Sequence, residues 1–476
     1  MSIQDGLCYA SLVQQIDPNC GPRYLFTAPW DPVLVRRGDA LGLRALADEF
    51  SDVVAPGLSN RVRDGRWVTI LAWCLVRSQE VFHAGGGRSV VTRAEQRDRY
   101  AWLRPLEMMW VARTIALARE DWRKRSLAGQ RRIWPWYQNH ESSTSRFGMT
   151  EDQFRAYRQT GMYGGYRIAF RKWPGMTRGG DGWTPGPKTD ELATWLDKKL
   201  GAARPAQADD DNEDSLSGRS VKLNRGKEDL WWFRHWATFD EGGKNADENT
   251  LPRRKTDYAI LPERHLLKPL IFGSDRFGIR RLAVANEIAK SGAIDHIGIC
   301  EHLASVFDGD RTLAVLPHFS RLADAGMAAM ELIARGMMRD GSVALADIAS
   351  LSSAKPVCND LMAAAKEWRD KAAMQIRHIE AAHRFANAIP SARPIECLGA
   401  LLHYHERYGG GLRWFVLRNG RVEPRTPSRS GSSDYRFRLW SLCRLAVQCG
   451  VMGNMPSPLR GEDEAQEAET SGDANE

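Results

Sequence analysis

The most regular pattern of apolar and polar positions in the chain lies between Trp30 and Phe82. Apolar residues recur there at the spacing of one helix face, at Leu43, Leu46, Ala47, Phe50, Val53 and Val54. This period predicts an amphipathic α-helix, and Asp39 stands at its start, where a carboxylate can accept hydrogen bonds from free backbone N–H groups. Pro56-Gly57 predicts the end of the helix.

A second helix is predicted after this break, with Ser59 or Asn60 as its cap and its end near His83. Its apolar residues cover much of its girth, so we expect it to be central in its domain. The core positions are Trp67, Ile70, Leu71 and Cys74.

Three arginines, Arg61, Arg63 and Arg66, lie around the start of this second helix. The helix dipole opposes cations at that end. One interpretation is a cluster that contacts phosphate, and the other is a set of ion pairs with Asp52 and Asp64.

The same stretch carries a resemblance. The order of Asp39, Leu41-Gly42, an amphipathic helix, Pro56-Gly57-Leu58-Ser59 and Arg63 resembles the N-terminus of some uncharacterised bacterial proteins. Those families are often encoded in phage-defence gene clusters, beside helicases or nucleases. The resemblance covers mainly residues 30–82 and implies a bacterial, intracellular, antiviral setting, with partners among the other subunits of the gene cluster. It implies no reaction and no catalytic residue.

Helical periodicity continues through most of the chain. The further predicted helices are 92–121, 189–200, 228–236, 276–289, 300–306, 317–339, 359–388, 395–408 and 434–450. Lys355-Pro356 is expected to be a loop, and Asn419-Gly420 between two β-forming runs predicts a hairpin. The fold class is therefore mainly α, with multi-helix bundle-like domains and a small C-terminal β-hairpin, an order compatible with a winged-helix-like module.

An acidic, polar segment at 202–226 is expected to be a flexible linker or loop, because it contains few apolar residues. It separates a predicted N-terminal helical domain, 1–201, from a C-terminal helical domain, 227–455, with the hairpin at 412–426. Residues 456–476 are expected to be a disordered acidic tail.

The charge of the chain is unevenly placed. The formal net charge is +8, and residues 461–476 contain seven acidic residues and no basic one, so the rest of the chain carries +15. A body this basic favours polyanionic partners, meaning nucleic acid (DNA or RNA) or an anionic membrane surface, although a solvated arginine-rich surface has the same composition.

Basic and aromatic residues alternate most densely between Asp121 and Glu141. Such residues can grip phosphate and stack on bases, or arginine stems can simply cover tryptophan faces in a core. The candidate nucleic-acid-binding residues are Arg61, Arg63, Arg66, Arg123, Lys124, Arg125, Arg131, Arg132, Trp134, Trp136, Arg171, Lys172, Arg436 and Arg444.

Tests for catalytic motifs find no GxxxxGK[ST] loop and no GxSxG elbow. His403, His405 and Glu406 form the densest titratable group, but positions i and i+2 of a helix point apart. A second group, around His296 and His302, fits no closed zinc pattern. We therefore expect no metal and no cofactor, and a protein without catalytic activity is favoured over an enzyme.

The eight cysteines include no CxxC pair, which favours reduced, buried thiols. The sequence has no signal-peptide pattern at its start and no apolar run of about 18 residues, the length that a membrane span needs. The expected setting is therefore cytoplasmic, with no membrane partner.

The leading hypothesis is a nucleic-acid-contacting, non-catalytic component of a bacterial multi-protein system. The resemblance adds antiviral defence as its setting. Two alternatives stay open at this point: a scaffold subunit that binds a partner protein through aromatic surfaces, and a divergent metal-dependent nuclease that uses His403, His405 or Glu406.

Overall fold

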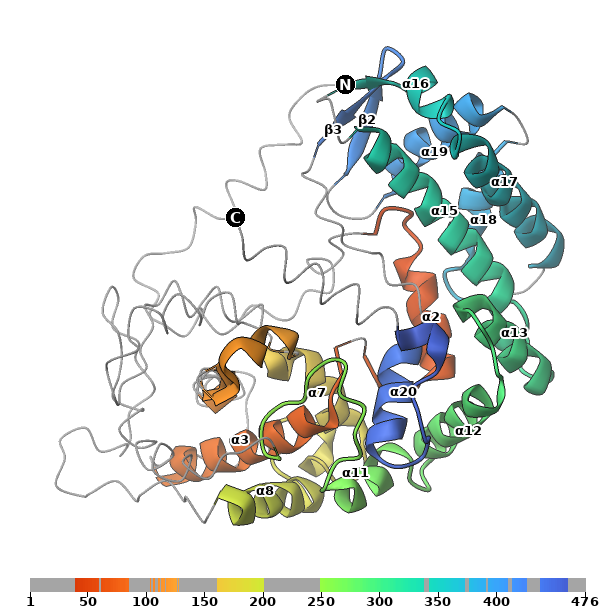
Figure 1. Ribbon diagram of the computed structural model, residues 1–476. Coiled ribbons are helices and arrows are strands. Elements are labelled where there is room, and N and C mark those ends of the chain that lie inside the picture. Colours follow the sequence, from red (N-terminus) through yellow and green to blue (C-terminus); the bar gives the residue numbers. More distant parts are fainter. Residues whose placement is uncertain are drawn as a thin grey trace, which may run out of the picture. The chain divides into compact units, whose positions relative to one another are not determined.

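The computed structural model describes residues 39–59, 61–84, 161–200, 249–337, 342–372, 376–390, 393–409, 413–425, 437–460 and part of 103–127. These residues are mainly α-helical with one small antiparallel sheet, as the sequence predicts (Figure 1). The chain divides into two compact units: unit 1 is Met1–Trp30, Asp64–Asp257 and Leu261–Leu266, and unit 2 is Asp31–Arg63, Tyr258–Ile260 and Leu267–Glu476. These division points differ from the expected linker at 202–226, which lies outside the described residues.

Unit 1 is organised around α3 (Gly65–Ala84), which packs against α7 (Met162–Lys172) and α8 (Pro187–Leu200). Two short 3-10 helices, η4 (Arg119–Lys124) and η5 (Arg178–Gly180), belong to the same unit. The four predicted core residues of α3, from Trp67 to Cys74, have no exposed surface, which confirms the central position of this helix. The Trp73 indole N–H also donates to the Asp197 carboxylate of α8 at 2.7 Å.

The start of α3 differs from the prediction. Asp64, rather than Ser59, caps the helix, because its Oδ1 accepts from the Arg66 N–H at 3.0 Å and its Oδ2 from the Arg253 N–H at 2.8 Å. The Tyr166 hydroxyl accepts from the Asp64 N–H at 3.0 Å. A carboxylate so placed satisfies helix donors that have no partner within the helix.

Unit 2 contains the remaining elements. They are α2 (Arg44–Val54), α12 (Arg276–Lys290), α13 (His296–Val306), α14 (Arg311–Ala314), α15 (Leu316–Met337), β1 (Val343–Ala344), α16 (Leu345–Ala349), α17 (Ala354–Lys371), α18 (Ile379–Ala388), α19 (Pro394–Tyr408), β2 (Phe415–Arg418), β3 (Arg421–Pro424) and α20 (Leu439–Gln448). Helix α11 (Arg264–Ile271) contains the point at which the chain passes from unit 1 to unit 2.

The centre of unit 2 is α15, which lies beside α17 (Figure 1) and also packs on α13. Its Phe319 ring lies 4.9 Å from that of Phe50 on α2 and 6.0 Å from that of Trp368 on α17. The predicted apolar face of α2 therefore meets this core, and the Asp39 carboxylate accepts from the N–H groups of Leu43 and Arg44 at 2.9 and 3.0 Å. Both predictions about α2 are confirmed.

Two glycines permit close packing in unit 2. Gly42 has a φ of +65°, and a Cβ there would lie 2.5 Å from the Tyr408 carbonyl oxygen. A Cβ on Gly326 of α15 would lie 2.7 Å from Leu41 and 2.8 Å from the Phe385 ring. The Leu41-Gly42 pair that carries part of the sequence resemblance therefore has a packing role.

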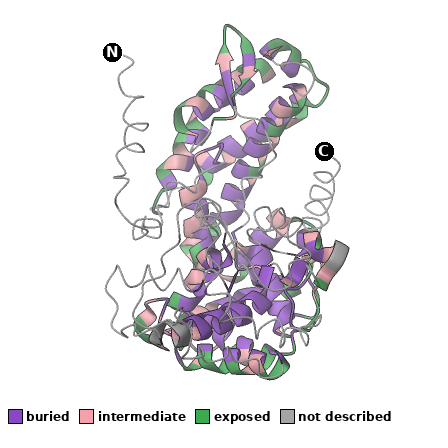
Figure 2. Ribbon diagram, turned by 90° about the vertical axis from the view of Figure 1, so that its left-hand side faces the viewer, coloured by how far each residue is buried: buried purple, intermediate pink, exposed green. Residues whose placement is uncertain are grey.

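The predicted hairpin is present as β2 and β3, with Asn419 and Gly420 at φ values of 49° and 72°. Positive φ at both central residues is the geometry that favours Asn-Gly in a two-residue turn. The turn is exposed (Figure 2). A third strand, β1, pairs with β3 and makes the order β1-β3-β2. β1 has only two residues, which is too short for an alternating apolar and polar pattern to predict it.

The region after α15 corrects two expectations. The single helix predicted over 359–388 is two helices, because α17 ends at Lys371 and α18 begins at Ile379 after His378, whose φ is 64°. Lys355-Pro356 lies in the first turn of α17 and is not a loop. Proline fits there, because the N–H that it lacks would have no partner within the helix.

The buried face of α12 includes an arginine, while one of its isoleucines faces solvent. Ile279 is 57% exposed, and Arg281 has no exposed surface. The Arg281 guanidinium donates to the carbonyls of Ile271 and Pro56, both at 2.5 Å. An arginine thus occupies an interior position because its donors satisfy backbone carbonyls.

Candidate nucleic-acid interface

Three arginines of unit 2 lie close together at the surface: Arg44 at the start of α2, and Arg61 and Arg63 in the turn after Pro56-Gly57. Arg61 is exposed, and the other two are half-buried. Partial burial lowers the pKa of Arg61, and the positive charges of Arg44 and Arg63 lower it further. We call these three residues the arginine cluster.

The carboxylates nearest to this cluster are shared with other cations. Arg44 lies 3.6 Å from Asp48, and burial raises the pKa of that carboxyl in spite of Arg44 and Arg438. Arg438 also pairs with Asp52.

An aromatic side chain stands behind the cluster. The guanidinium carbon of Arg63 lies 5.5 Å from the centre of the Trp440 ring on α20, and that of Arg444 lies 5.1 Å from it. Trp440 is only 9% exposed and Arg444 has no exposed surface. The ring therefore supports Arg63 at the surface, and the expectation that Arg444 contacts nucleic acid is corrected.

Arg66 is corrected in the same way, in unit 1. It has no exposed surface, and its Nε and Nη2 lie 2.7 and 2.8 Å from the two carboxylate oxygens of Glu263. The Thr69 hydroxyl donates to the same carboxylate at 3.2 Å. A two-pronged ion pair in the interior satisfies the guanidinium, so Arg66 is not available to a phosphate.

The basic stretch at 123–125 divides between surface and interior. Arg125 is 2% exposed, and its guanidinium donates to the Pro252 carbonyl, so this third expected contact is also corrected. Lys124 is exposed, 3.8 Å from Asp121. Arg123 is half-buried, 5.3 Å from the Trp122 ring. The other candidates lie outside the described residues: Arg131, Arg132, Trp134, Trp136 and Arg436.

A second basic surface in unit 1 is formed by the end of α7 and the loop after it. Arg171, Lys172 and Arg178 are exposed. Arg167 lies 4.8 Å from the centre of the Trp183 ring, and Gly182 lies so close to Arg171 that a Cβ would come within 2.7 Å of its Cγ.

The carboxylate of Asp181, in the same loop, is held by hydrogen bonds within the loop. Asp181 accepts from the N–H groups of Trp183 and Thr184 at 2.7 and 2.9 Å, and from the Thr184 hydroxyl at 2.7 Å. The basic residues of this loop therefore face solvent without Asp181 among them. Arg178 acts on a different carboxylate, Asp190, whose pKa is raised by burial and lowered in part by Arg178.

The histidine proposed for a nuclease is part of the fold. His405 is 1% exposed; its Nδ1 lies 2.7 Å from the Ala40 carbonyl oxygen, and its Nε2 accepts from the Trp414 N–H at 2.9 Å. Both ring nitrogens are thus engaged in the neutral form, and burial lowers the pKa of the ring. No nitrogen of His405 is available to a metal.

The second histidine group also separates in space. His296 contacts the Ser320 hydroxyl at 3.1 Å, His302 lies 3.4 Å from Glu287, and His318 lies 2.7 Å from Glu367. Among the described residues, no three His, Cys, Asp or Glu side chains gather in a geometry that could hold a metal. Within the same residues, no helix has the length and apolar character needed to cross a membrane.

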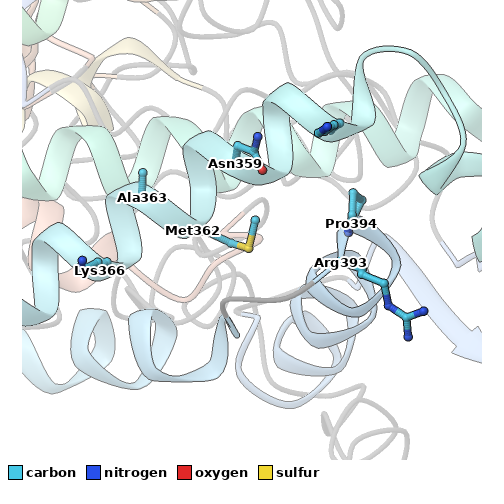
Figure 3. A pocket seen from close by; sticks show the side chains of 7 residues that line it. Asn359, Met362, Ala363, Lys366, Arg393 and Pro394 are labelled. Atoms are coloured by element: carbon cyan, nitrogen blue, oxygen red, sulfur yellow. The ribbon is translucent and has the colours of Figure 1, made fainter.

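A depression of about 620 Å³ lies in unit 2, between α17 and the start of α19. Met362 and Pro394 face each other across it, while Arg393 points away (Figure 3). Lys355 and Lys366 lie at its rim. No catalytic constellation opens into it.

Comparison with known proteins leaves these surfaces without a precedent: no protein-family model, curated protein or solved structure matches the chain.

Proposed function

We propose that this protein is a non-catalytic, nucleic-acid-contacting component of a bacterial multi-protein system, and that the arginine cluster of unit 2 contacts the phosphate backbone. The observation that carries the proposal is the grouping of Arg44, Arg61 and Arg63 on one surface of unit 2, with Arg61 exposed and the other two half-buried. Like charges held together at a surface cost free energy, and a polyanion offsets that cost when it binds.

Two further observations support a polyanionic partner. The basic surface of unit 1 has Arg171, Lys172 and Arg178 exposed on one helix end and one loop. The chain outside its acidic tail carries +15. Contacts of this kind position a protein on a nucleic acid without reading its sequence, so we propose binding to DNA or RNA of any sequence.

The setting in antiviral defence rests on the sequence resemblance of residues 30–82 alone. It adds to the proposal the expectation that the protein works with other subunits of one gene cluster. That part is tested by co-purification of such subunits with the tagged protein, with a nuclease-treated lysate as the control for bridging by nucleic acid.

A protein-interaction subunit is the second candidate, favoured by the depression between α17 and α19. Its lining includes the apolar residues Met362, Ala363 and Pro394 and the two lysines Lys355 and Lys366. Apolar residues beside lysines fit an acidic peptide with apolar side chains. For the nuclease alternative the described residues offer no comparable support, because His405 is held by Ala40 and Trp414.

The test is a salt series with purified protein on short duplex and single-stranded DNA. Log affinity should fall linearly with log salt, with a slope of about −0.9 for each phosphate contacted on a duplex and about −0.7 on a single strand. The double variant Arg61→Ala/Arg63→Ala should bind more weakly and reduce the duplex slope by about 1.8.

Arg311→Ala/Arg335→Ala is the matched control, since it removes the same charge from exposed positions of unit 2 outside the cluster. It should leave the slope near that of the parent. Absence of binding at low salt overturns the nucleic-acid proposal. An equal loss in both double variants overturns the assignment to the arginine cluster.

A further inference from the structure

The β2–β3 hairpin of unit 2 carries an excess of positive charge outside the arginine cluster. Residues 413–425 contain four arginines and one acidic residue, Glu423, so their formal charge is 4 − 1 = +3. All four arginines are exposed: Arg413, Arg418, Arg421 and Arg425. The turn between the strands is exposed as well (Figure 2). The hairpin therefore presents a strongly basic surface to solvent.

Two of these arginines face each other at the tip of the hairpin. Arg418 at the end of β2 is paired directly with Arg421 at the start of β3, and Asn419-Gly420 forms the turn between them. Cross-strand partners lie on one face of the sheet with their Cβ atoms about 4.5–5.5 Å apart, and like charges in such a pair are destabilising. The acidic residue of the hairpin, Glu423, is opposite Val416 instead. The strand register therefore brings two positive charges together at the tip.

The two arginines of the tip differ in their contacts with the rest of the protein. The Arg421 guanidinium donates to Ser342, from Nε to the hydroxyl at 3.0 Å and from Nη2 to the carbonyl oxygen at 2.6 Å. In the part of the chain that the structure describes, no hydrogen bond or ion pair engages the Arg418 guanidinium. Arg421 is therefore held beside the tip, while Arg418 keeps its N–H donors for a ligand.

The chemistry of the tip favours one class of anionic partner. Its four residues, 418–421, present guanidinium groups and an amide but no large apolar side chain. Protein interfaces depend on aromatic or aliphatic anchors, and binding to a membrane surface depends on apolar side chains that enter the lipid. Stacking on single-stranded bases needs exposed aromatic rings, and the aromatic residue of β2, Phe415, is buried. The tip therefore fits phosphate, which a duplex presents along both strands.

The base of the hairpin lies close to the start of α2, which carries part of the arginine cluster. The His405 ring accepts from the Trp414 N–H at 2.9 Å, and its other nitrogen lies 2.7 Å from the Ala40 carbonyl oxygen. Arg418 is four positions after Trp414. Arg44 is likewise four positions after Ala40. Each stretch spans at most about 15 Å, so the tip and the cluster lie within about 40 Å, little more than one turn of duplex DNA.

We propose that the tip of the β2–β3 hairpin is a second phosphate-binding surface of unit 2, at which Arg418 contacts the backbone of duplex DNA beside the fixed charge of Arg421. This inference rests on the proposed function, since the partner is the same nucleic acid, and it adds a contact outside the arginine cluster. The bound phosphate supplies the negative charge that the paired arginines lack, and so offsets their repulsion.

The test extends the salt series to variants of the tip, with a duplex of about 20 base pairs, or about two turns, as the probe. Arg418→Ala should weaken binding and reduce the slope of log affinity against log salt by about 0.9, the value for one phosphate. Arg335→Ala is the matched control, because it removes the same charge from an exposed position of α15 and should leave the slope unchanged. Circular dichroism checks that both variants are folded.

Charge reversal separates binding from folding. Arg418→Glu places a carboxylate opposite Arg421, so the cross-strand repulsion becomes an attraction and the midpoint of thermal unfolding should not fall. The affinity of this variant for the duplex should be lower than that of Arg418→Ala, and the difference should shrink as salt is raised. A lower unfolding midpoint with unchanged affinity would give Arg418 a structural role and overturn the proposal.

The remaining outcomes distinguish this surface from the arginine cluster. If Arg61→Ala/Arg63→Ala weakens binding while both Arg418 variants bind as the parent does, the hairpin surface is overturned and the cluster stands. If the parent binds no duplex at low salt, both are overturned. A labelled polyglutamate peptide is the probe for an acidic protein partner. Loss of peptide binding in Arg418→Ala, with duplex binding unchanged, would overturn the assignment to DNA.

Discussion

Arg61 and Arg66 are close neighbours in the sequence, and their surroundings are opposite. Arg61 is exposed beside Arg44 and Arg63, and partial burial, followed by these two charges, lowers its pKa. Arg66 has no exposed surface, and two of its nitrogens hold the Glu263 carboxylate. The comparison teaches that a stretch of sequence rich in arginine does not by itself form a positively charged surface. What separates the two residues is a carboxylate far along the chain.

Arg281 extends the comparison to a third environment. It is as buried as Arg66, but its guanidinium donates to backbone carbonyls, and burial lowers its pKa to about 10. Arg66 is thus paired with an opposite charge and Arg281 with backbone carbonyls, whereas Arg61 is exposed near two further arginines. Four predictions test these differences.

The largest effect is expected for Glu263→Ala. Removal of one partner leaves the Arg66 charge buried without its carboxylate, which typically costs about 3–5 kcal/mol of unfolding free energy. Denaturant titration measures the change. The matched control Arg66→Met/Glu263→Leu removes both charges and should lose much less stability. Equal losses in the two variants would contradict the ion-pair explanation.

A smaller loss is expected for Arg281→Met, which keeps most of the volume but removes the donors to two buried carbonyls. A buried polar group left unpaired costs about 1–3 kcal/mol, and we expect about 2–3 kcal/mol in all because solvent reaches neither carbonyl easily. Arg280→Met, on the same helix but half-exposed beside Asp310, is the control and should cost less. A smaller loss in Arg281→Met than in the control contradicts the prediction.

The third prediction concerns pH. Burial lowers the pKa of His405 in the folded protein, so the unfolded state takes up a proton first as the pH falls. The contribution of His405 to stability should therefore be constant above about pH 6.5 and fall below it, down to the lowered folded pKa, by at most about 1.4 kcal/mol per pH unit. Urea titrations between pH 7.5 and 5 check this. His403→Gln, at an exposed position, should keep the slope, and His405→Gln should reduce it.

The smallest stability effect is expected for Arg61→Ser. An exposed charge contributes within about 0.5 kcal/mol, and here its removal relieves repulsion from Arg44 and Arg63, so the variant should be equal to the parent or slightly more stable. The gain should be larger at low salt and vanish near 1 M, where screening acts within about 3 Å. A clear loss of stability would show that Arg61 is structural.

Much of the local structure followed from the sequence. The helical spacing of Leu46, Phe50 and Val54 predicts α2, because these apolar residues form one face of a helix and that face is stabilised by burial. Asp39 was recognisable as a cap, and Asn419-Gly420 as a turn, since few other residues suit positive φ. These elements were predictable because the interactions that form them lie within a few residues of each other.

Other features depended on distant residues. β1 exists only because Val343 and Ala344 meet β3. The break between α17 and α18 ends at His378, whose positive φ no apolar period predicts. The fold class was therefore predictable, while strand pairing and helix breaks were not.

The candidate interface shows the same division at the level of single residues. By itself the sequence determined that arginines gather around the start of α3 and that the chain outside its tail is strongly basic. Only the tertiary structure decided that Arg61 and Arg63 are at the surface while Arg66, Arg125 and Arg444 are inside. The reason is physical: an arginine can be buried wherever folding brings a carboxylate, a carbonyl or an aromatic ring to its guanidinium, and those partners come from segments that a local pattern does not contain.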